Sequence, residues 1–82
     1  MKIIVEEMNI LNEFYVIVTF DDSKIITFKN YVNGISIEVL YDSFDIFQKY
    51  PIVAQMISKY KDNNKLSQIK HDFEMLANIC SK

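Results

Sequence analysis

Residues 31–42 have the sequence YVNGISIEVLYD, in which an Asn-Gly pair separates two runs of alternating apolar and polar residues. Asn-Gly is a favoured pair for a two-residue type I′ turn, because both turn residues need a positive φ. Alternation with a period of two indicates strands that have one buried and one exposed face. The stretch therefore predicts a β-hairpin between residues 24–32 and residues 35–41.

A two-residue loop at Asn33-Gly34 also predicts the register of this hairpin. It sets Lys29 directly opposite Glu38, a favourable cross-strand pair on the outward face of the sheet. The other pairs expected on the outward face are Tyr31 with Ser36 and Thr27 with Leu40. The pairs expected on the core face are Val32 with Ile35, Asn30 with Ile37, Phe28 with Val39 and Ile26 with Tyr41.

The residues before the hairpin predict two further strands. Residues 14–20, FYVIVTF, are β-branched and aromatic, as is typical of a central strand, and residues 3–7 predict a shorter strand. We expect residues 9–13 to connect these two strands. Residues 21–23 have turn-forming side chains and predict a three-residue loop. This loop aligns Val18 with Ile26 and Val16 with Phe28 on the core face.

After Asp42 the apolar period changes to that of a helix. Ser43 is expected to cap a short helical turn that stops before Pro51, because proline disrupts the interior of a helix. Pro51 suits the first position of a helix that extends to about residue 61, and residues 62–64 can cap the next helix. The apolar stripes of the two helices are Val53, Met56, Ile57 and Tyr60 in the first, and Leu66, Ile69, Phe73, Leu76, Ala77 and Cys80 in the second.

Together these elements predict an α+β fold. Four antiparallel strands form a meander (residues 1–42), and two C-terminal helices (residues 43–82) pack on one of its faces. The 82 residues are expected to make one domain with a modest core. No apolar run reaches the ~20 residues of a membrane span, and the first residues do not resemble a signal peptide. A cytoplasmic location is therefore expected, in a bacterium or in the host of a phage.

The sequence lacks the common catalytic motifs. One glycine excludes a phosphate-binding loop, and one histidine with one cysteine does not complete a zinc site. Cys80 lies on an apolar stripe, where a packed thiol is expected, and no intramolecular disulfide can form. Turn and capping roles account for the paired acids Asp21-Asp22 and Asp42 with Asp45. We therefore expect no enzyme, cofactor or metal site, although a small enzyme that used carboxylates alone would carry no motif.

Composition and charge point to a particular kind of partner. The chain has thirteen isoleucines, nine lysines and no arginine, a bias typical of an AT-rich genome. The net charge is −2, but residues 1–48 carry −5 and residues 49–82 carry +3. We therefore expect an acidic sheet layer and a basic helical layer. Without arginine and with a net negative charge, direct binding to nucleic acid is disfavoured.

The outward sheet face combines aromatic, apolar and acidic residues, a composition typical of a recognition surface. We predict that it binds a larger basic protein, such as a nucleic-acid-binding effector, and no membrane. The candidate contact residues are Glu6, Glu7, Asp21, Asp22, Glu38 and Asp42, with Tyr15 and Tyr31 as aromatic anchors.

In size, charge and composition the chain resembles phage and mobile-element inhibitors of host machinery, such as anti-CRISPR proteins. No sequence motif contributes to this resemblance. It implies a non-enzymatic inhibitor that presents carboxylates where a nucleic-acid channel would hold phosphates. Two alternatives remain at the level of sequence: an assembly subunit that forms a homodimer through its open sheet face, and the small carboxylate enzyme.

Overall fold

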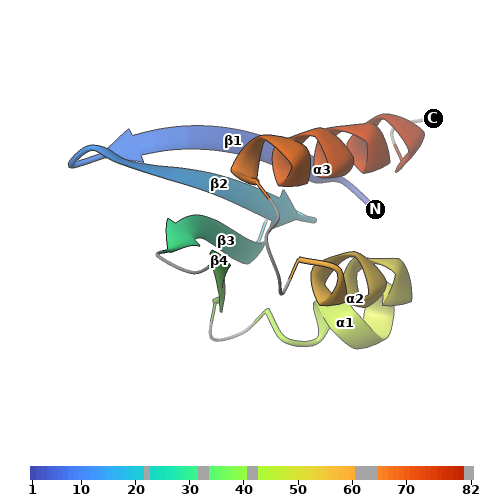
Figure 1. Ribbon diagram of the computed structural model, residues 1–82. Helices are drawn as coiled ribbons and strands as arrows, with labels where there is room; N and C mark the ends of the chain where they lie inside the picture. Colours follow the sequence, from blue (N-terminus) through green and yellow to red (C-terminus); the bar gives the residue numbers. More distant parts are fainter. Residues whose placement is uncertain (22, 32–33, 41–42, 61–64, 81–82) are drawn as a thin grey trace.

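The computed structural model describes residues 1–21, 23–31, 34–40, 43–60 and 65–80, with the backbone alone for Tyr31 and Gly34. Four antiparallel strands form one open sheet in the order β1-β2-β3-β4, and helices follow (Figure 1). The elements are β1 (Ile3–Ile10), β2 (Glu13–Phe20), β3 (Lys24–Tyr31), β4 (Gly34–Val39), α1 (Ile46–Lys49), α2 (Pro51–Ser58) and α3 (Leu66–Cys80). The predicted α+β fold with a meander sheet is confirmed.

The described helices cover one face of the sheet. In Figure 1, α3 lies along β1 and β2, and the pair formed by α1 and α2 lies near it. Along β2, Val16, Val18 and Phe20 are buried, whereas the alternate residues Ile17 and Thr19 keep part of their surface exposed. This alternation distinguishes an inner face, which packs on the helices, from an outer face.

Four aromatic rings form the centre of the core. The ring centroid of Phe28 lies 5.5 Å from that of Phe73 and 6.0 Å from that of Tyr60, and Phe20 meets Phe73 edge to face at 6.1 Å. The buried Tyr60 donates its hydroxyl hydrogen to Asp72 Oδ2 at 2.8 Å. Burial and this hydrogen bond raise the pKa of Tyr60, so the phenol stays neutral in the core.

The connection between the first two strands is shorter than predicted. Residues 9–13 were expected to form it, but β1 extends to Ile10 and only Leu11 and Asn12 separate it from β2. Their φ angles are 51° and 65°, as a type I′ hairpin turn requires. A left-handed conformation at a residue such as Leu11 costs roughly 1–2 kcal/mol, which explains why the sequence did not indicate a turn here.

This hairpin projects beyond the rest of the sheet. The ladder between β2 and β3 begins at Tyr15, so the strand ends before the turn have no third strand beside them. Figure 1 shows the resulting tip extending past the helices. We call residues 8–15 the hairpin arm.

The two later turns differ in how well the sequence predicted them. The three-residue loop at residues 21–23 is confirmed, and it pairs Val18 with Ile26 and Val16 with Phe28.

The predicted register of the β3–β4 hairpin is wrong by two residues. Lys29 pairs with Ser36 instead of Glu38. Tyr31 pairs with Gly34, so Gly34 is the first residue of β4 and not part of the turn, as had been predicted. The intervening residues 32–33 lie outside the described ranges. A shift of two residues keeps every side chain on its expected face, so the alternation alone does not distinguish the two registers. The actual partners of the core residues are Val39 for Ile26 and Ile37 for Phe28, and Thr27 faces Glu38.

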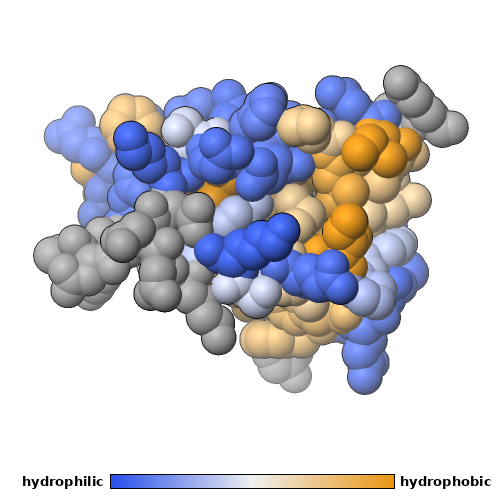
Figure 2. Space-filling view, turned by 45° about the vertical axis from the view of Figure 1, so that its right-hand side comes forward, coloured by the Kyte–Doolittle hydropathy of each residue, from blue (hydrophilic) through white to orange (hydrophobic). Residues whose placement is uncertain are grey.

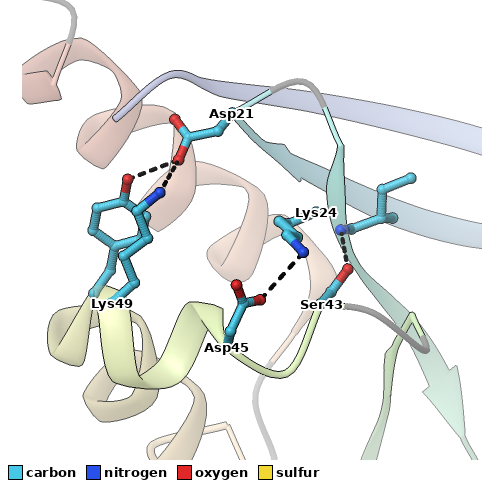
Figure 3. Close-up of polar contacts among 7 residues, drawn as sticks. Asp21, Lys24, Ser43, Asp45 and Lys49 are labelled. Carbon is cyan, nitrogen blue, oxygen red and sulfur yellow. Dashed lines mark hydrogen bonds and ion pairs between the residues drawn. The ribbon is translucent and has the colours of Figure 1, made fainter.

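Ser43 connects the sheet to the helices instead of capping one, as had been predicted. It is fully buried, and its hydroxyl accepts the backbone N–H of Ile25 at 2.8 Å (Figure 3). Because the hydroxyl already satisfies this strand N–H, α1 begins later, with Asp45 at its N-cap and no side-chain cap. A nearby ion pair between Lys24 and Asp45, 3.5 Å long, also links β3 to α1.

Asp21 forms a second connection, which we call the Asp21 clamp. Its carboxylate accepts the backbone N–H of Lys2 at 3.0 Å. It also accepts the hydroxyl hydrogen of Tyr50 at 2.7 Å and lies 3.6 Å from Lys49 Nζ (Figure 3). The Lys2 and Tyr50 hydrogen bonds, with the Lys49 charge, hold the pKa of Asp21 below its usual value. The clamp joins the turn after β2 to the start of β1 and to the α1–α2 junction.

The helical predictions are largely confirmed. Pro51 is the first residue of α2, which ends at Ser58 instead of continuing to about residue 61. Residues 62–64, predicted to cap the next helix, lie outside the described ranges. The residues of the two predicted stripes that are buried are Val53, Tyr60, Leu66, Ile69, Phe73 and Leu76. Within the described part of the chain, no helix is both long enough and apolar enough to cross a membrane.

The role of Ser43 predicts a specific loss of stability. In Ser43→Ala the buried N–H of Ile25 loses its acceptor, and we expect the free energy of unfolding to fall by roughly 1–3 kcal/mol. Urea denaturation measures this change. The control is Ser58→Ala, which removes an exposed hydroxyl from α2 and is expected to change stability by less than about 0.5 kcal/mol. Equal effects of the two substitutions would contradict the role of Ser43.

The Asp21 clamp predicts a pH dependence of stability. A carboxyl group whose folded pKa lies below its unfolded pKa stabilises the protein above the unfolded value, and this contribution disappears as pH falls through the folded value. Asp21→Asn keeps the shape and tolerates the positive φ but cannot ionise. We expect it to be less stable than the wild type at pH 7, and the difference to vanish between roughly pH 4 and pH 2. Thermal unfolding of the wild type and of the variant across this range measures the difference. A stability difference that did not change as the pH fell would contradict the prediction.

Candidate functional site: the outer face of the sheet

An apolar band crosses the outer face of the sheet from one edge to the other. It consists of one residue from each strand in turn, with Leu40 continuing β4: Ile4, Ile17, Ile25 and Leu40. In the register Ile4 faces Thr19, Thr19 faces Ile25, and the N–H of Leu40 bonds the carbonyl of Ile25 at 3.0 Å. Members on neighbouring strands are therefore opposite one another or two positions apart, close enough for apolar side chains to contact.

The members of the apolar band are partly or largely exposed, with Ile4 at 41% and Leu40 at 48%. Met8 and Ile10 extend the apolar surface along β1 towards the tip of the hairpin arm, and both are exposed. Scattered surface hydrophobes are ordinary, but contiguous ones on a face without cover are typical of a contact surface. The outer face thus has more apolar surface than the sequence led us to expect.

Acidic side chains border the apolar band. Glu6 faces Ile17 across the β1–β2 ladder, and Glu38 faces Thr27 across the β3–β4 ladder. Both are exposed. With Glu13, the described strands place three acids on the outer face against the one lysine Lys29, so this face is negatively charged.

Tyr15 is held in a fixed orientation on the same face. Its hydroxyl donates to Glu13 Oε2 at 2.9 Å, and Lys29 Nζ contacts that same oxygen at 2.8 Å. The Lys29 ammonium also lies 5.7 Å from the centre of the Tyr15 ring, within cation–π range. An aromatic ring fixed in this way loses little entropy when it binds a partner.

The hydrogen bonds of this group hold its three members in their ordinary charge states. Hydrogen bonds from Lys29 and then from Tyr15 lower the pKa of Glu13, whereas the bond to Glu13 raises the pKa values of Tyr15 and Lys29. All three shifts move away from neutrality, so a charged carboxylate, a charged ammonium and a neutral phenol persist near pH 7. In the described ranges, no three side chains among His, Cys, Asp and Glu gather as a metal site.

The predicted contact residues do not all lie together. Glu6, Glu38 and Tyr15 are on the outer face. Glu7 is on the inner face, where its carboxylate pairs with Lys70 of α3 at 3.1 Å, and Asp21 belongs to the clamp. Asp22 and Asp42 lie outside the described ranges, and for Tyr31 the structure gives the backbone at the end of β3.

Sequence reasoning missed the apolar contribution of β1. Ile4, Met8 and Ile10 belong to the outer face, but they were not among the predicted contacts. The alternation of β1 is interrupted by the pair Glu6-Glu7, one residue of which must face inward. Lys70 of α3 compensates the negative charge of Glu7 on the inner face, and the local sequence pattern does not reveal this ion pair.

The opposite, helix-bearing side has a different surface. Figure 2 shows hydrophilic side chains over one part of it and hydrophobic side chains over another, towards the end of the molecule where α3 finishes. A cleft at that end is lined by Met1, Ile3, Ala77 and Cys80, together with Lys2 and Asp21. Because the clamp already engages Asp21, we place the candidate interface on the outer face of the sheet.

Comparisons with protein-family models, with curated proteins and with solved structures find no match for this chain. What the protein does must therefore be inferred from the outer face itself.

Proposed function

We propose that the protein is a non-enzymatic binding module that docks the outer face of its sheet onto another protein. The observation that carries this proposal is the apolar band, which spans four strands on a face that the described helices do not cover. Desolvating contiguous apolar surface drives association, and the fixed ring of Tyr15 adds a rigid contact beside it.

The charges on the outer face favour a basic partner. Glu6 and Glu38 border the apolar band, so a complementary surface would have an apolar strip flanked by lysine or arginine side chains. A second copy of the chain docked face to face would instead bring the same acids together. Such like-charge contacts are unfavourable, which favours a different protein as the occupant of this face.

A narrower form of the proposal is inhibition of a nucleic-acid-handling protein. The acidic border supports it, because carboxylates can occupy sites that otherwise bind phosphates. The apolar band and the internal engagement of Glu7 and Asp21 make this mimicry partial. If the narrower form is right, nucleic acid added to the purified complex competes with the protein for its partner.

Reversal of the border charges tests the proposal. The double variant Glu6→Lys and Glu38→Lys keeps the fold, because both side chains are exposed. Affinity capture from the source cells, followed by binding measurements with the purified partner, should show an affinity at least about tenfold weaker than that of the wild type. The affinity of the wild type should also fall as salt is added.

Glu74→Lys provides the matched control, since Glu74 is an exposed acid on α3, on the other side of the molecule. This variant should bind the partner like the wild type. A partner that binds the double variant as tightly as the wild type, or that is lost with Glu74→Lys alone, would show that the outer face is not the interface.

A further inference from the structure

β4 forms one edge of the open sheet, with β3 on one side and, in the described part of the chain, no strand on the other. The N–H of Leu40 bonds the carbonyl of Ile25, so the backbone of Leu40 is directed towards β3. In an antiparallel ladder this direction alternates from one residue to the next. The backbone N–H and C=O groups of Ile35, Ile37 and Val39 therefore point away from β3, towards the open edge.

The edge of β4 lacks the features that usually prevent a strand from pairing with another chain. Its sequence, GISIEV, contains no proline or lysine, and its register with β3 has no bulge. The side chains of Ile35, Ile37 and Val39 are only half-buried. Helix α3 lies over β1 and β2, away from this edge (Figure 1). The edge thus offers both backbone groups and apolar side chains to another strand.

We propose that two copies of the chain pair antiparallel through their β4 edges, with the two-fold axis at Ile37. Ile37 of one copy then lies opposite Ile37 of the other, and Ile35 lies opposite Val39. These are the residues whose backbone groups point outwards, so the pairing makes a ladder of about six hydrogen bonds. It joins the two sheets into one, with the helices of both copies on the same side.

The charges along β4 favour a second copy in this register. Glu38 of each copy lies opposite Ser36 of the other, so no like charges face each other. A two-fold axis one residue closer to Leu40 would instead set Glu38 against Glu38. The other edge of the sheet is less suitable, because antiparallel pairing about the middle of β1 sets Glu6 or Glu7 against the same acid of the other copy.

Two substitutions of Ser36 test the pairing by sedimentation analysis over a range of concentrations. The wild type should dimerise. Ser36→Glu sets a second carboxylate against Glu38 on each side of the axis and should weaken dimerisation by roughly tenfold, whereas Ser36→Lys sets an ammonium there and should strengthen it. The matched control is Ser58→Glu, which adds the same charge to α2 and should leave dimerisation unchanged.

The fold of the monomer responds to these substitutions in the opposite sense. Within one molecule Ser36 faces Lys29 across the β3–β4 ladder, so a carboxylate at this position is favourable and an ammonium is unfavourable. Thermal unfolding at low protein concentration should therefore show that Ser36→Glu is at least as stable as the wild type. Loss of the fold cannot then account for its weaker dimerisation.

Disulfide formation tests the register itself. Ser36 and Glu38 of the other copy form a pair without mutual hydrogen bonds, in which the Cα atoms lie about 4.5 Å apart, close enough for a disulfide. In a Cys80→Ala background, which removes the natural thiol, a mixture of Ser36→Cys and Glu38→Cys proteins should become cross-linked under mild oxidation. A mixture of Ser36→Cys and Ser58→Cys proteins controls for random collision and should not.

The Ser36→Cys protein alone should also cross-link poorly. Its two introduced thiols are diagonal across the ladder, with Cα atoms roughly 7–8 Å apart, which is too far for a disulfide. The proposal fails if the wild type stays monomeric at all concentrations, if Ser36→Glu dimerises as tightly as the wild type, or if Ser36→Cys alone cross-links as readily as the mixture.

Edge pairing leaves the outer faces of both copies open, so it does not depend on the proposed function. The double variant Glu6→Lys and Glu38→Lys should dimerise like the wild type, because Ser36 of the other copy carries no charge, even though this variant loses its partner. Failure of the proposed function and failure of edge pairing therefore give different results.

Discussion

The packing of Phe73 against the sheet is the interaction on which the rest of the structure depends. Its ring meets Phe20 and Phe28 from the sheet and Tyr60 from the segment after α2, so one side chain of α3 unites both parts of the chain. An antiparallel sheet needs cover on one face only. Because α3 packs on the inner face, with Ile46 and Val53 of the α1–α2 pair completing the core, the opposite face is the one that we propose for docking.

The charge of a segment is a poor guide to the charge of a surface. The first half of the chain is strongly acidic, but Glu7 and Asp21 stabilise the fold by contacts with Lys70, Lys49 and Tyr50. Glu6 and Glu38 remain on the outer face, and Glu13 is balanced there by Lys29. The outer face is consequently an apolar surface with an acidic border instead of the acidic surface that composition indicated, and such a surface is suited to protein contact.

The molecule presents two surfaces with different chemistry. The outer face is broad, apolar in the middle and acidic at the border, which suits a basic protein. The hairpin arm is narrow, and it exposes the apolar side chain of Leu11 at its tip. The hairpin arm arises from the length of β1 and β2, since these strands extend beyond the part of the sheet that pairs with β3.

Local patterns in the sequence were enough to predict the strands, the helical stripes and the three-residue turn before β3, because a period of two or 3.6 residues is a property of neighbouring residues. They also placed Glu38 and Tyr15 on the outer face. Only the tertiary structure decided the β3–β4 register, because alternation does not distinguish registers that differ by two residues. It also decided the partners of Ser43, Asp21 and Glu7. Those partners lie 18 to 63 residues away, so their contacts depend on how the layers pack and have no local signature.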